Sequence, residues 1–145
     1  MTRVPSSTLL TIVLLLSAGC SREITGTPAA SAWPPAGSCL TAARDLKLMR
    51  SEKHRFLYAS PAQVWDDEKP IGTLAAGTTV TISRIVHYKE LVFVILPASY
   101  DWDAVFAKPV DGPFAGQEVA ILGTHSYFQA KRNDRFIPCP PRAGP

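Results

Sequence analysis

The three cysteines can take part in more kinds of chemistry than the other residues of this sequence. Their positions separate them into two groups. A thiol can be acylated, can form a disulfide, or can act as a metal ligand or a nucleophile. Cys20 directly follows an apolar run, whereas Cys39 and Cys139 lie at the two ends of the main body of the chain. The sequence has no Cys-x-x-Cys spacing and no local pattern that places a histidine base beside a cysteine, so we predict neither a metal site nor a catalytic thiol.

The other patterns that could support catalysis or ion binding are incomplete. His125 lies in a GTHS turn with no carboxylate nearby in the sequence, and the chain contains no Gly-x-Ser-x-Gly motif. Asp101 and Asp103 begin like a calcium-binding loop, but Val105 and Phe106 stand where the next ligand and the glycine belong. We therefore predict that the protein is not an enzyme and has no catalytic residue, no metal and no cofactor.

The residues before Cys20 have the layout of an export signal. Arg3 precedes an apolar run at 9–18, and such a run is too short for a bilayer-spanning helix, which needs about 20 residues. Small residues lead directly to Cys20, and this arrangement resembles a bacterial lipobox. The resemblance implies that residues 1–19 are a lipoprotein signal peptide, that Cys20 receives the lipid, palmitate included, and that Ser21 directs the protein to the periplasmic face of the outer membrane. A plain secretory signal and an uncleaved anchor are the alternatives.

The exported chain divides into a tether, one domain and a short tail. Residues 20–38 are rich in Ser, Thr, Ala, Pro and Gly, so we expect a flexible tether in which Trp33 either docks on the domain or is exposed to solvent. Residues 39–140 are long enough for a single core, and residues 141–145 form the tail. Because an exported protein meets an oxidising compartment, we predict that Cys39 and Cys139 form a disulfide that closes the domain.

The charge pattern excludes one class of partner. The formal net charge of the full chain is only +3, which is not typical of a nucleic-acid-binding domain, so we predict no nucleic-acid partner. Basic residues gather at 44–55 and 131–135. These are either solvated faces or a basic patch for an anionic partner such as a lipid headgroup or an acidic protein.

Short strands between Gly and Pro turns predict an all-β fold, a barrel or sandwich of short antiparallel strands. We expect strands at 78–88 and 90–96 joined by a tight hairpin, with 90–96 buried on both sides, and further strands at 102–107, 117–122, 126–130 and 135–137. A break in the alternation at 84–86 predicts a bulge or bend. Residues 40–50 fit either a helix or a strand, and we favour a short helix or an irregular segment.

Residues 56–82 resemble the first half of a bacterial SH3-like domain. The sequences Gly72-Thr73-Leu74 and Gly77-Thr78-Thr79-Val80-Thr81-Ile82 carry the resemblance. It implies a small SH3-like barrel and the binding of peptidoglycan. From the residues themselves, we expect Gly77 to occupy a turn with positive φ and the apolar side chains at 80 and 82 to point inward.

Aromatic side chains among polar neighbours are the candidate binding residues. Tyr100 and Trp102 lie in the sequence SYDWD and Tyr127 lies in HSYFQ, and tyrosine and tryptophan are favoured at interfaces. Packing in the core or at its rim is the alternative. We therefore expect a lipid-anchored envelope protein that binds a protein partner or peptidoglycan without catalysis. The alternatives are a periplasmic inhibitor or immunity-type lipoprotein that neutralises a hydrolase, and a cell-wall-acting enzyme.

Overall fold

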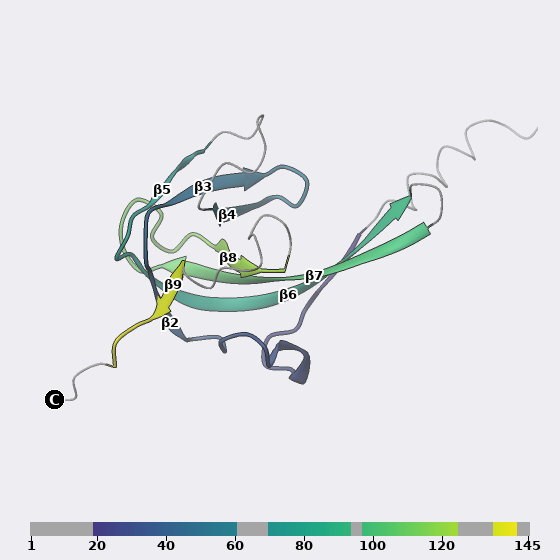
Figure 1. Ribbon diagram of the computed structural model, residues 1–145, viewed down its shortest axis with the longest axis horizontal. Coiled ribbons are helices and arrows are strands. Elements are labelled where there is room, and N and C mark those ends of the chain that lie inside the picture. Colours follow the sequence, from purple (N-terminus) through teal and green to yellow (C-terminus); the bar gives the residue numbers. More distant parts are fainter. Residues whose placement is uncertain (1–18, 61–69, 94–96, 125–134, 142–145) are drawn as a thin grey trace, which may run out of the picture.

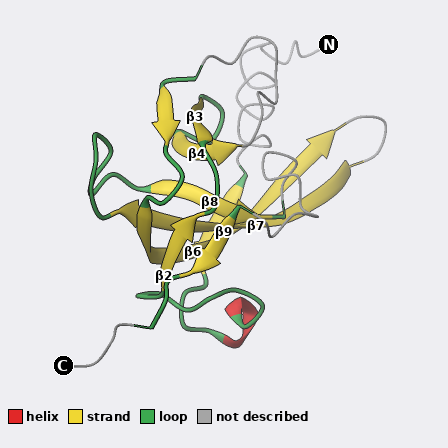
Figure 2. Cartoon of the chain, turned by 60° about the vertical axis from the view of Figure 1, so that its left-hand side comes forward, coloured by secondary structure: helices red, strands yellow, loops and turns green. Residues whose placement is uncertain are grey.

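The computed structural model describes residues 19–60, 70–93, 97–124 and 135–141, and these residues build an all-β fold (Figures 1 and 2). The elements are β1 (Cys20–Glu23), a short 3-10 helix η1 (Pro28–Ala30), β2 (Cys39–Ala42), β3 (Leu46–Ser51), β4 (Phe56–Ser60), β5 (Gly72–Leu74), β6 (Thr79–Phe93), β7 (Pro97–Pro109), β8 (Val119–Gly123) and β9 (Phe136–Pro138). The predicted all-β class is confirmed. Within the described ranges, no helix has the length and apolar character that a bilayer crossing requires.

The strands belong to one mixed sheet with the order β5-β3-β4-β8-β7-β6-β2-β9, and β1 pairs with β6. The β4–β8 pair is parallel and the other pairs are antiparallel. The strands expected at 117–122 and 135–137 are present as β8 and β9, and the one expected at 126–130 lies outside the described residues. The similarity to SH3-like barrels stays a prediction.

Strands β6 and β7 are much longer than we expected, with 15 and 13 residues. Figure 1 shows that their paired ends extend beyond the rest of the sheet as a projection, which we call the arm (residues 86–93 and 97–104). Strand β1 pairs with the first part of the arm, at residues 86–89. The tight hairpin predicted between 88 and 90 is wrong, because Tyr88, Lys89 and Glu90 continue the ladder of β6 opposite β7. The expectation that 90–96 is buried on both sides is also wrong, since Leu91 is 43% exposed.

A bulge in β6 confirms the predicted break in its alternation. The register shifts between Ile82 and Arg84. Ile82 and Ile85 both lie in the main core, whereas Arg84 faces the opposite side and holds its guanidinium 4.8 Å from the centre of the Phe106 ring. Glu118 on the neighbouring loop accepts two hydrogen bonds from Arg84, at 2.9 and 2.6 Å. The extra residue therefore lets β6 supply apolar side chains to the core on both sides of the bulge.

Two hydrophobic clusters pack on the two faces of the sheet. The first is the main core and includes Val80, Ile82, Leu46, Leu48 and Ile121. The second cluster contains Met49, Tyr58, Val86, Trp102, Ala104, Phe106 and Ala120. The second cluster lies at the base of the arm, so it joins the arm to the β3–β4 hairpin.

Residues 40–50 are not helical, in contrast to the interpretation that we favoured. They form parts of β2 and β3, in which Leu46 and Leu48 are buried and Lys47 is exposed. Both edges of β3 are paired, with β4 on one side and β5 on the other. The local sequence of this segment fits either a helix or a strand, and the long-range strand pairs decide in favour of the strand.

The segment 20–38, which we expected to be a flexible tether, makes specific contacts with the domain. Residues 20–23 pair with β6 as β1, and Ile24 and Ala30 are buried in the main core. Trp33 docks on the same core and donates a hydrogen bond from Nε1 to Asp103 Oδ2 at 3.1 Å. Burial of these few apolar side chains offsets the ordering of an otherwise polar segment.

Both ends of the main domain meet at the predicted disulfide, which is confirmed. Cys39 in β2 is bonded to Cys139, with a Cα–Cα distance of 5.4 Å across 100 residues of sequence. The backbone N–H of Cys139 also donates to the carbonyl of Cys39 at 3.1 Å. Gly77, in the turn before β6, has a φ of 85°, and Val80 and Ile82 are buried, as the sequence predicted.

Candidate functional site

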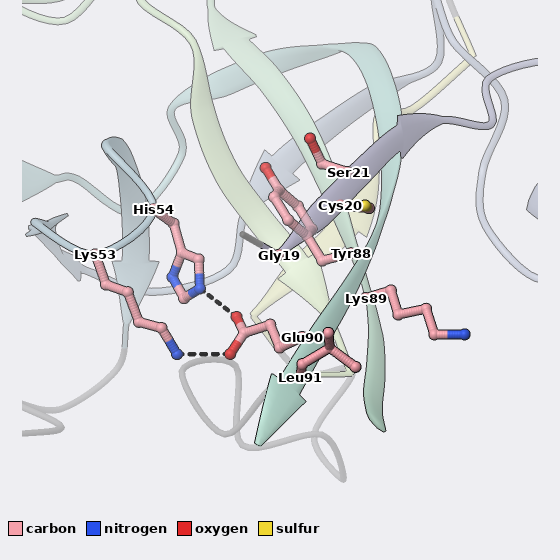
Figure 3. A pocket seen from close by; sticks show the side chains of 9 residues that line it. All are labelled: Gly19, Cys20, Ser21, Lys53, His54, Tyr88, Lys89, Glu90 and Leu91. Carbon is pink, nitrogen blue, oxygen red and sulfur yellow. Dashed lines mark hydrogen bonds and ion pairs between the residues drawn. The ribbon is translucent and has the colours of Figure 1, made fainter. Parts of the chain in front are cut away.

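A pocket lies between the turn of the β3–β4 hairpin and the arm, and we take it as the candidate site (Figure 3). Its volume is about 300 Å³. One wall is the turn with Lys53 and His54, and another is the stretch of β6 that carries Tyr88 and Glu90. Residues 19–21, at the start of β1, line a third side. The complete lining is Gly19, Cys20, Ser21, Lys53, His54, Tyr88, Lys89, Glu90 and Leu91.

Local geometry in the β3–β4 turn positions His54. The turn spans residues 52–55, and Arg55 adopts a positive φ of 58° while its N–H donates to the carbonyl of Ser51 at 2.7 Å. The Ser51 hydroxyl accepts a hydrogen bond from the His54 backbone N–H at 3.2 Å and lies 3.2 Å from Nδ1 of the same ring. With Nδ1 turned toward Ser51, the other ring nitrogen of His54 points across the pocket to Glu90.

Glu90 is the centre of the polar contacts in the pocket. Its Oε2 accepts a hydrogen bond from Lys53 Nζ at 2.6 Å, and its Oε1 accepts one from Trp102 Nε1 at 3.2 Å. His54 Nε2 also bonds Oε1. The side chains of His54 and Glu90 are 8% and 12% exposed, whereas Lys53 is 67% exposed. The carboxylate is thus fixed by three donors, two of which are shielded from water.

These donors also determine the charge of Glu90. Burial disfavours the ionised carboxylate, but the hydrogen bonds from Lys53, His54 and Trp102 outweigh burial and lower the pKa of Glu90 to about 2. Glu90 is therefore ionised throughout the physiological pH range. A general acid or base works best with a pKa near the operating pH, so this carboxylate is better suited to holding positive charge than to transferring protons.

Aromatic rings surround the carboxylate. Tyr88 and Trp102 face each other across β6 and β7 and stack with their centres 4.1 Å apart at an interplanar angle of 10°. His54 meets Trp102 edge-on at 5.1 Å and lies parallel to Phe56 at 5.6 Å. Burial raises the pKa of Tyr88, and Arg84 offsets part of that increase. These ring contacts pack the His54 turn against the arm.

Ser51, His54 and Glu90 form a chain of hydrogen bonds with the residue types of a hydrolase triad. However, Ser51 is 0% exposed, so its hydroxyl cannot reach a bound substrate. Ser51 also serves the backbone of the turn. The chain of bonds therefore orients His54 and holds the hairpin against the arm.

The sequence-predicted site residues are placed differently by the structure. Tyr100 is on the arm, directly opposite Glu90, and is 43% exposed, and its role in binding stays a prediction. Trp102 is 1% exposed beneath Tyr88 and donates a hydrogen bond to Glu90, and its role in binding stays a prediction. Cys20 is exposed and unpaired with another cysteine, and its acylation stays a prediction. Tyr127 lies outside the described residues.

Lys53, His54 and Glu90 were not predicted as site residues. Alternate residues of a strand point to the same face, so Tyr88 and Glu90 share one face of β6, and their partners on β7 are Trp102 and Tyr100. This alternation is the sequence signal that could have identified Glu90. It was hidden by the expected hairpin at this position. Within the described ranges, no group of His, Cys, Asp and Glu side chains has the arrangement needed to hold a metal ion.

Comparison with known proteins does not extend these observations. No protein family, no curated protein and no solved structure matches the chain.

Proposed function

We propose that the protein is a lipid-anchored, non-catalytic binding module of the bacterial cell envelope, held at Cys20 on the periplasmic face of the outer membrane. The proposal combines the export signal and the cysteine that follows it with a disulfide-closed all-β domain. Disulfides persist in oxidising compartments such as the periplasm. The ligand in this proposal is peptidoglycan or a protein of the envelope.

The observation that carries the proposal is the placement of Cys20 relative to the pocket. In the β1–β6 pair, Cys20 is opposite Lys89 and Ser21 is opposite Tyr88. Paired residues share a face of the sheet, and successive residues alternate. Figure 3 shows the side chains of Cys20 and Lys89 directed away from His54 and Glu90. An acyl group on the sulfur of Cys20 would therefore point away from His54 and Glu90. Cleavage before Cys20 would remove Gly19 from the lining and leave Cys20 and Ser21 at that wall of the pocket.

The chemistry of the pocket suits a ligand with both polar and apolar surfaces. Lys53 offers an exposed ammonium group at the rim, and the Glu90 carboxylate is held in place beside it. Tyr100 adds an exposed aromatic ring on the same face of the arm. Fixed charges beside aromatic surface are typical of sites that bind sugars, peptides or protein loops.

Two features support binding rather than catalysis. The only hydroxyl bonded to His54 among the described residues belongs to Ser51, which is buried. Glu90, the one carboxylate that lines the pocket among the described residues, has a pKa of about 2 and is engaged by three donors. Neither group is poised for nucleophilic attack or proton transfer at neutral pH.

A second candidate function is that of a periplasmic inhibitor or immunity-type lipoprotein that neutralises a hydrolase. The projecting arm favours it, because a two-stranded projection can enter the cleft of an enzyme (Figure 1). A preorganised element loses little conformational entropy when it binds. This candidate predicts that a periplasmic hydrolase is captured by the wild-type chain and lost from an arm variant such as Tyr100→Ala.

The anchor and the ligand can be tested on the same preparations. We expect radiolabelled palmitate to be incorporated into the wild-type chain and not into Cys20→Ser, and the wild-type chain to fractionate with the outer membrane. We expect the extracted, processed chain to sediment with purified peptidoglycan sacculi across a salt series. Lys53→Gln should reduce the pelleted fraction, whereas Lys47→Gln, a lysine exposed on β3 outside the pocket, should not.

Each outcome has a distinct meaning. Equal labelling of wild type and Cys20→Ser would contradict the anchor. Failure of the acylated wild-type chain to sediment would exclude the wall as ligand and leave an envelope protein, to be sought by capture from periplasm. Equal loss in Lys53→Gln and Lys47→Gln would show that sedimentation reflects charge alone and not the pocket.

A further inference from the structure

The face of the arm opposite the candidate site carries a second, differently charged pocket. Strand pairing aligns side chains from β1, β6 and β7 in two rows on this face. Directly paired residues have Cβ atoms about 5 Å apart, so each row is a set of close neighbours. The rows are Arg22–His87–Asp103 and Cys20–Lys89–Asp101.

The first row holds His87 in one orientation. Asp103 Oδ1 bonds His87 Nδ1 at 2.8 Å, and Asp103 Oδ2 accepts the hydrogen bond from Trp33 Nε1 at 3.1 Å. The backbone N–H of Asp103 also donates to Thr124 Oγ1 at 2.9 Å. With both oxygens of Asp103 engaged and Nδ1 occupied, the other nitrogen of His87 remains for a ligand. The His87 side chain is 34% exposed, so this nitrogen can be reached.

Three charged side chains of the two rows have no ion-pair or hydrogen-bond partner among the residues that the structure describes: Arg22, Lys89 and Asp101. All three are exposed. The cations lie on β1 and β6, and the anion lies on β7. The face therefore carries both positive and negative charge, with Lys89 directly paired with Asp101 in the ladder of β6 and β7.

A pocket of about 320 Å³ lies on this face. Arg22, His87 and Asp101 line it together with Thr124, and Ile24 contributes an apolar wall. The volume is at the lower end of the range for small-molecule sites, which starts at about 300 Å³. It fits a small group that carries both charges and not an extended polymer.

We propose that this pocket binds the phosphate–ammonium headgroup of a phospholipid. The guanidinium of Arg22 would hold the phosphate, since arginine matches phosphate oxygens with two parallel donors. Nε2 of His87, an acceptor because Nδ1 donates to Asp103, would accept a hydrogen bond from the ammonium. The carboxylate of Asp101 would hold the ammonium. Cys20 shares this face, so the headgroup would come from the leaflet that holds the acyl chains; in this respect the inference rests on the proposed function.

Such binding would orient the domain at the membrane. The face with Arg22 and Asp101 would lie against the headgroups, and the pocket around Glu90 would point into the periplasm. Strand β1 makes this orientation definite, because its pairing with β6 fixes Cys20 to the arm and removes the freedom of a tether.

The test uses a water-soluble headgroup, so that it does not depend on the anchor. We would titrate glycerophosphoethanolamine into the processed full chain in nonionic detergent and follow the histidine ring signals by NMR. Glycerol 3-phosphate, which lacks the ammonium, and ethanolamine, which lacks the phosphate, are the comparison ligands. We expect the His87 signals to move, His54 to stay unchanged, and glycerophosphoethanolamine to bind more tightly than either comparison ligand.

Variants assign the two charges of the ligand separately. Arg22→Gln should weaken both phosphate-bearing ligands by about fivefold or more, the effect of losing one charge-assisted contact. Asp101→Asn should weaken the two ligands that carry the ammonium, glycerophosphoethanolamine and ethanolamine, and leave glycerol 3-phosphate unchanged. Glu23→Gln is the matched control, because Glu23 is exposed on β1 but pairs with Val86 on the other face.

Equal affinity of glycerophosphoethanolamine and glycerol 3-phosphate would overturn the proposal in favour of simple phosphate binding. Absence of a His87 response, or an Arg22→Gln variant that binds like wild type, would also overturn it. Acylation is measured separately, by the mass of the N-terminal peptide, and wall binding is measured by sedimentation with sacculi. Failure at this pocket is therefore distinguishable from failure of the proposed function.

Discussion

The double variant Cys39→Ser/Cys139→Ser is expected to unfold with a free energy about 3–5 kcal/mol lower than that of the wild type. The disulfide closes a loop of 100 residues that contains nearly the whole domain. In the chain-entropy view, closing a loop of this length stabilises the folded state by up to about 4.7 kcal/mol, because it restricts the unfolded chain. Urea unfolding followed by far-ultraviolet circular dichroism measures the difference.

Cys20→Ser is the control for this prediction. Cys20 is exposed and forms no disulfide, so its substitution should leave the midpoint of unfolding unchanged. In thermal unfolding, the double variant should melt roughly 15 °C or more below the wild type, since 1 kcal/mol corresponds to about 4–8 °C in a domain of this size. A double variant as stable as Cys20→Ser would show that the bridge does not constrain the domain.

Glu90→Gln is expected to lower the free energy of unfolding at pH 7 by about 2–3 kcal/mol. The pKa of Glu90 falls from 4.5 to about 2 in the folded chain, and each pH unit corresponds to about 1.4 kcal/mol. The full difference is an upper figure, because water screens the exposed Lys53 ammonium. Glutamine keeps one acceptor for three donors but removes the charge that they share.

The same substitution should change the pH dependence of stability. A carboxylate with a depressed folded-state pKa stabilises the fold above its unfolded pKa, and this stabilisation is lost as the pH falls through the folded pKa. The contribution of Glu90 is therefore complete above pH 4.5 and lost toward pH 2. Glu118 also has a lowered pKa, so wild type minus Glu90→Gln is the informative difference curve.

Glu52→Gln is the matched control, because Glu52 is exposed in the same turn that carries Lys53 and His54. Its difference curve with the wild type should be flat within a few tenths of a kcal/mol. If the free energies of unfolding of Glu90→Gln and Glu52→Gln fell by the same amount between pH 4.5 and 2, the special role of Glu90 would be contradicted.

Local sequence signals were sufficient to predict those structural features that depend on one residue type or on one short pattern. Gly77 was predictable from its turn, and the bulge near Arg84 was predictable from the break in alternation. The pairing of Cys39 with Cys139 followed from an even number of remaining cysteines in an exported chain. Each of these inferences needed no knowledge of which strands pair.

The features that the sequence did not reveal depend on distant partners. Residues 46–51 became a strand because β4 and β5 pair with both of its edges. The continuation of β6 through Lys89 depends on β7 opposite it, not on the polar residues at that position. His54 and Glu90 meet only because the β3–β4 hairpin folds against the arm, 36 residues away in the chain.

Because the arm has two faces, a protein anchored through one of them would keep a ligand site on the other accessible. Cys20 and Arg22 share one face, and Tyr88 and Glu90 share the other. Pairing of β1 with β6 connects Cys20, where we propose the anchor, directly to the strand that carries Tyr88 and Glu90, without the intervening tether that composition suggested. A flexible linker would permit many orientations, whereas this arrangement permits few.

The most direct measurement is photo-crosslinking in living cells with a photoreactive phenylalanine in place of Tyr100, beside the pocket, or of Ile137, which is 52% exposed on β9. Binding at the pocket predicts an adduct with peptidoglycan or one envelope protein from position 100, reduced by Lys53→Gln, and no such adduct from position 137. Absence of an adduct at position 100, or the same adduct from both positions, would contradict binding through the pocket.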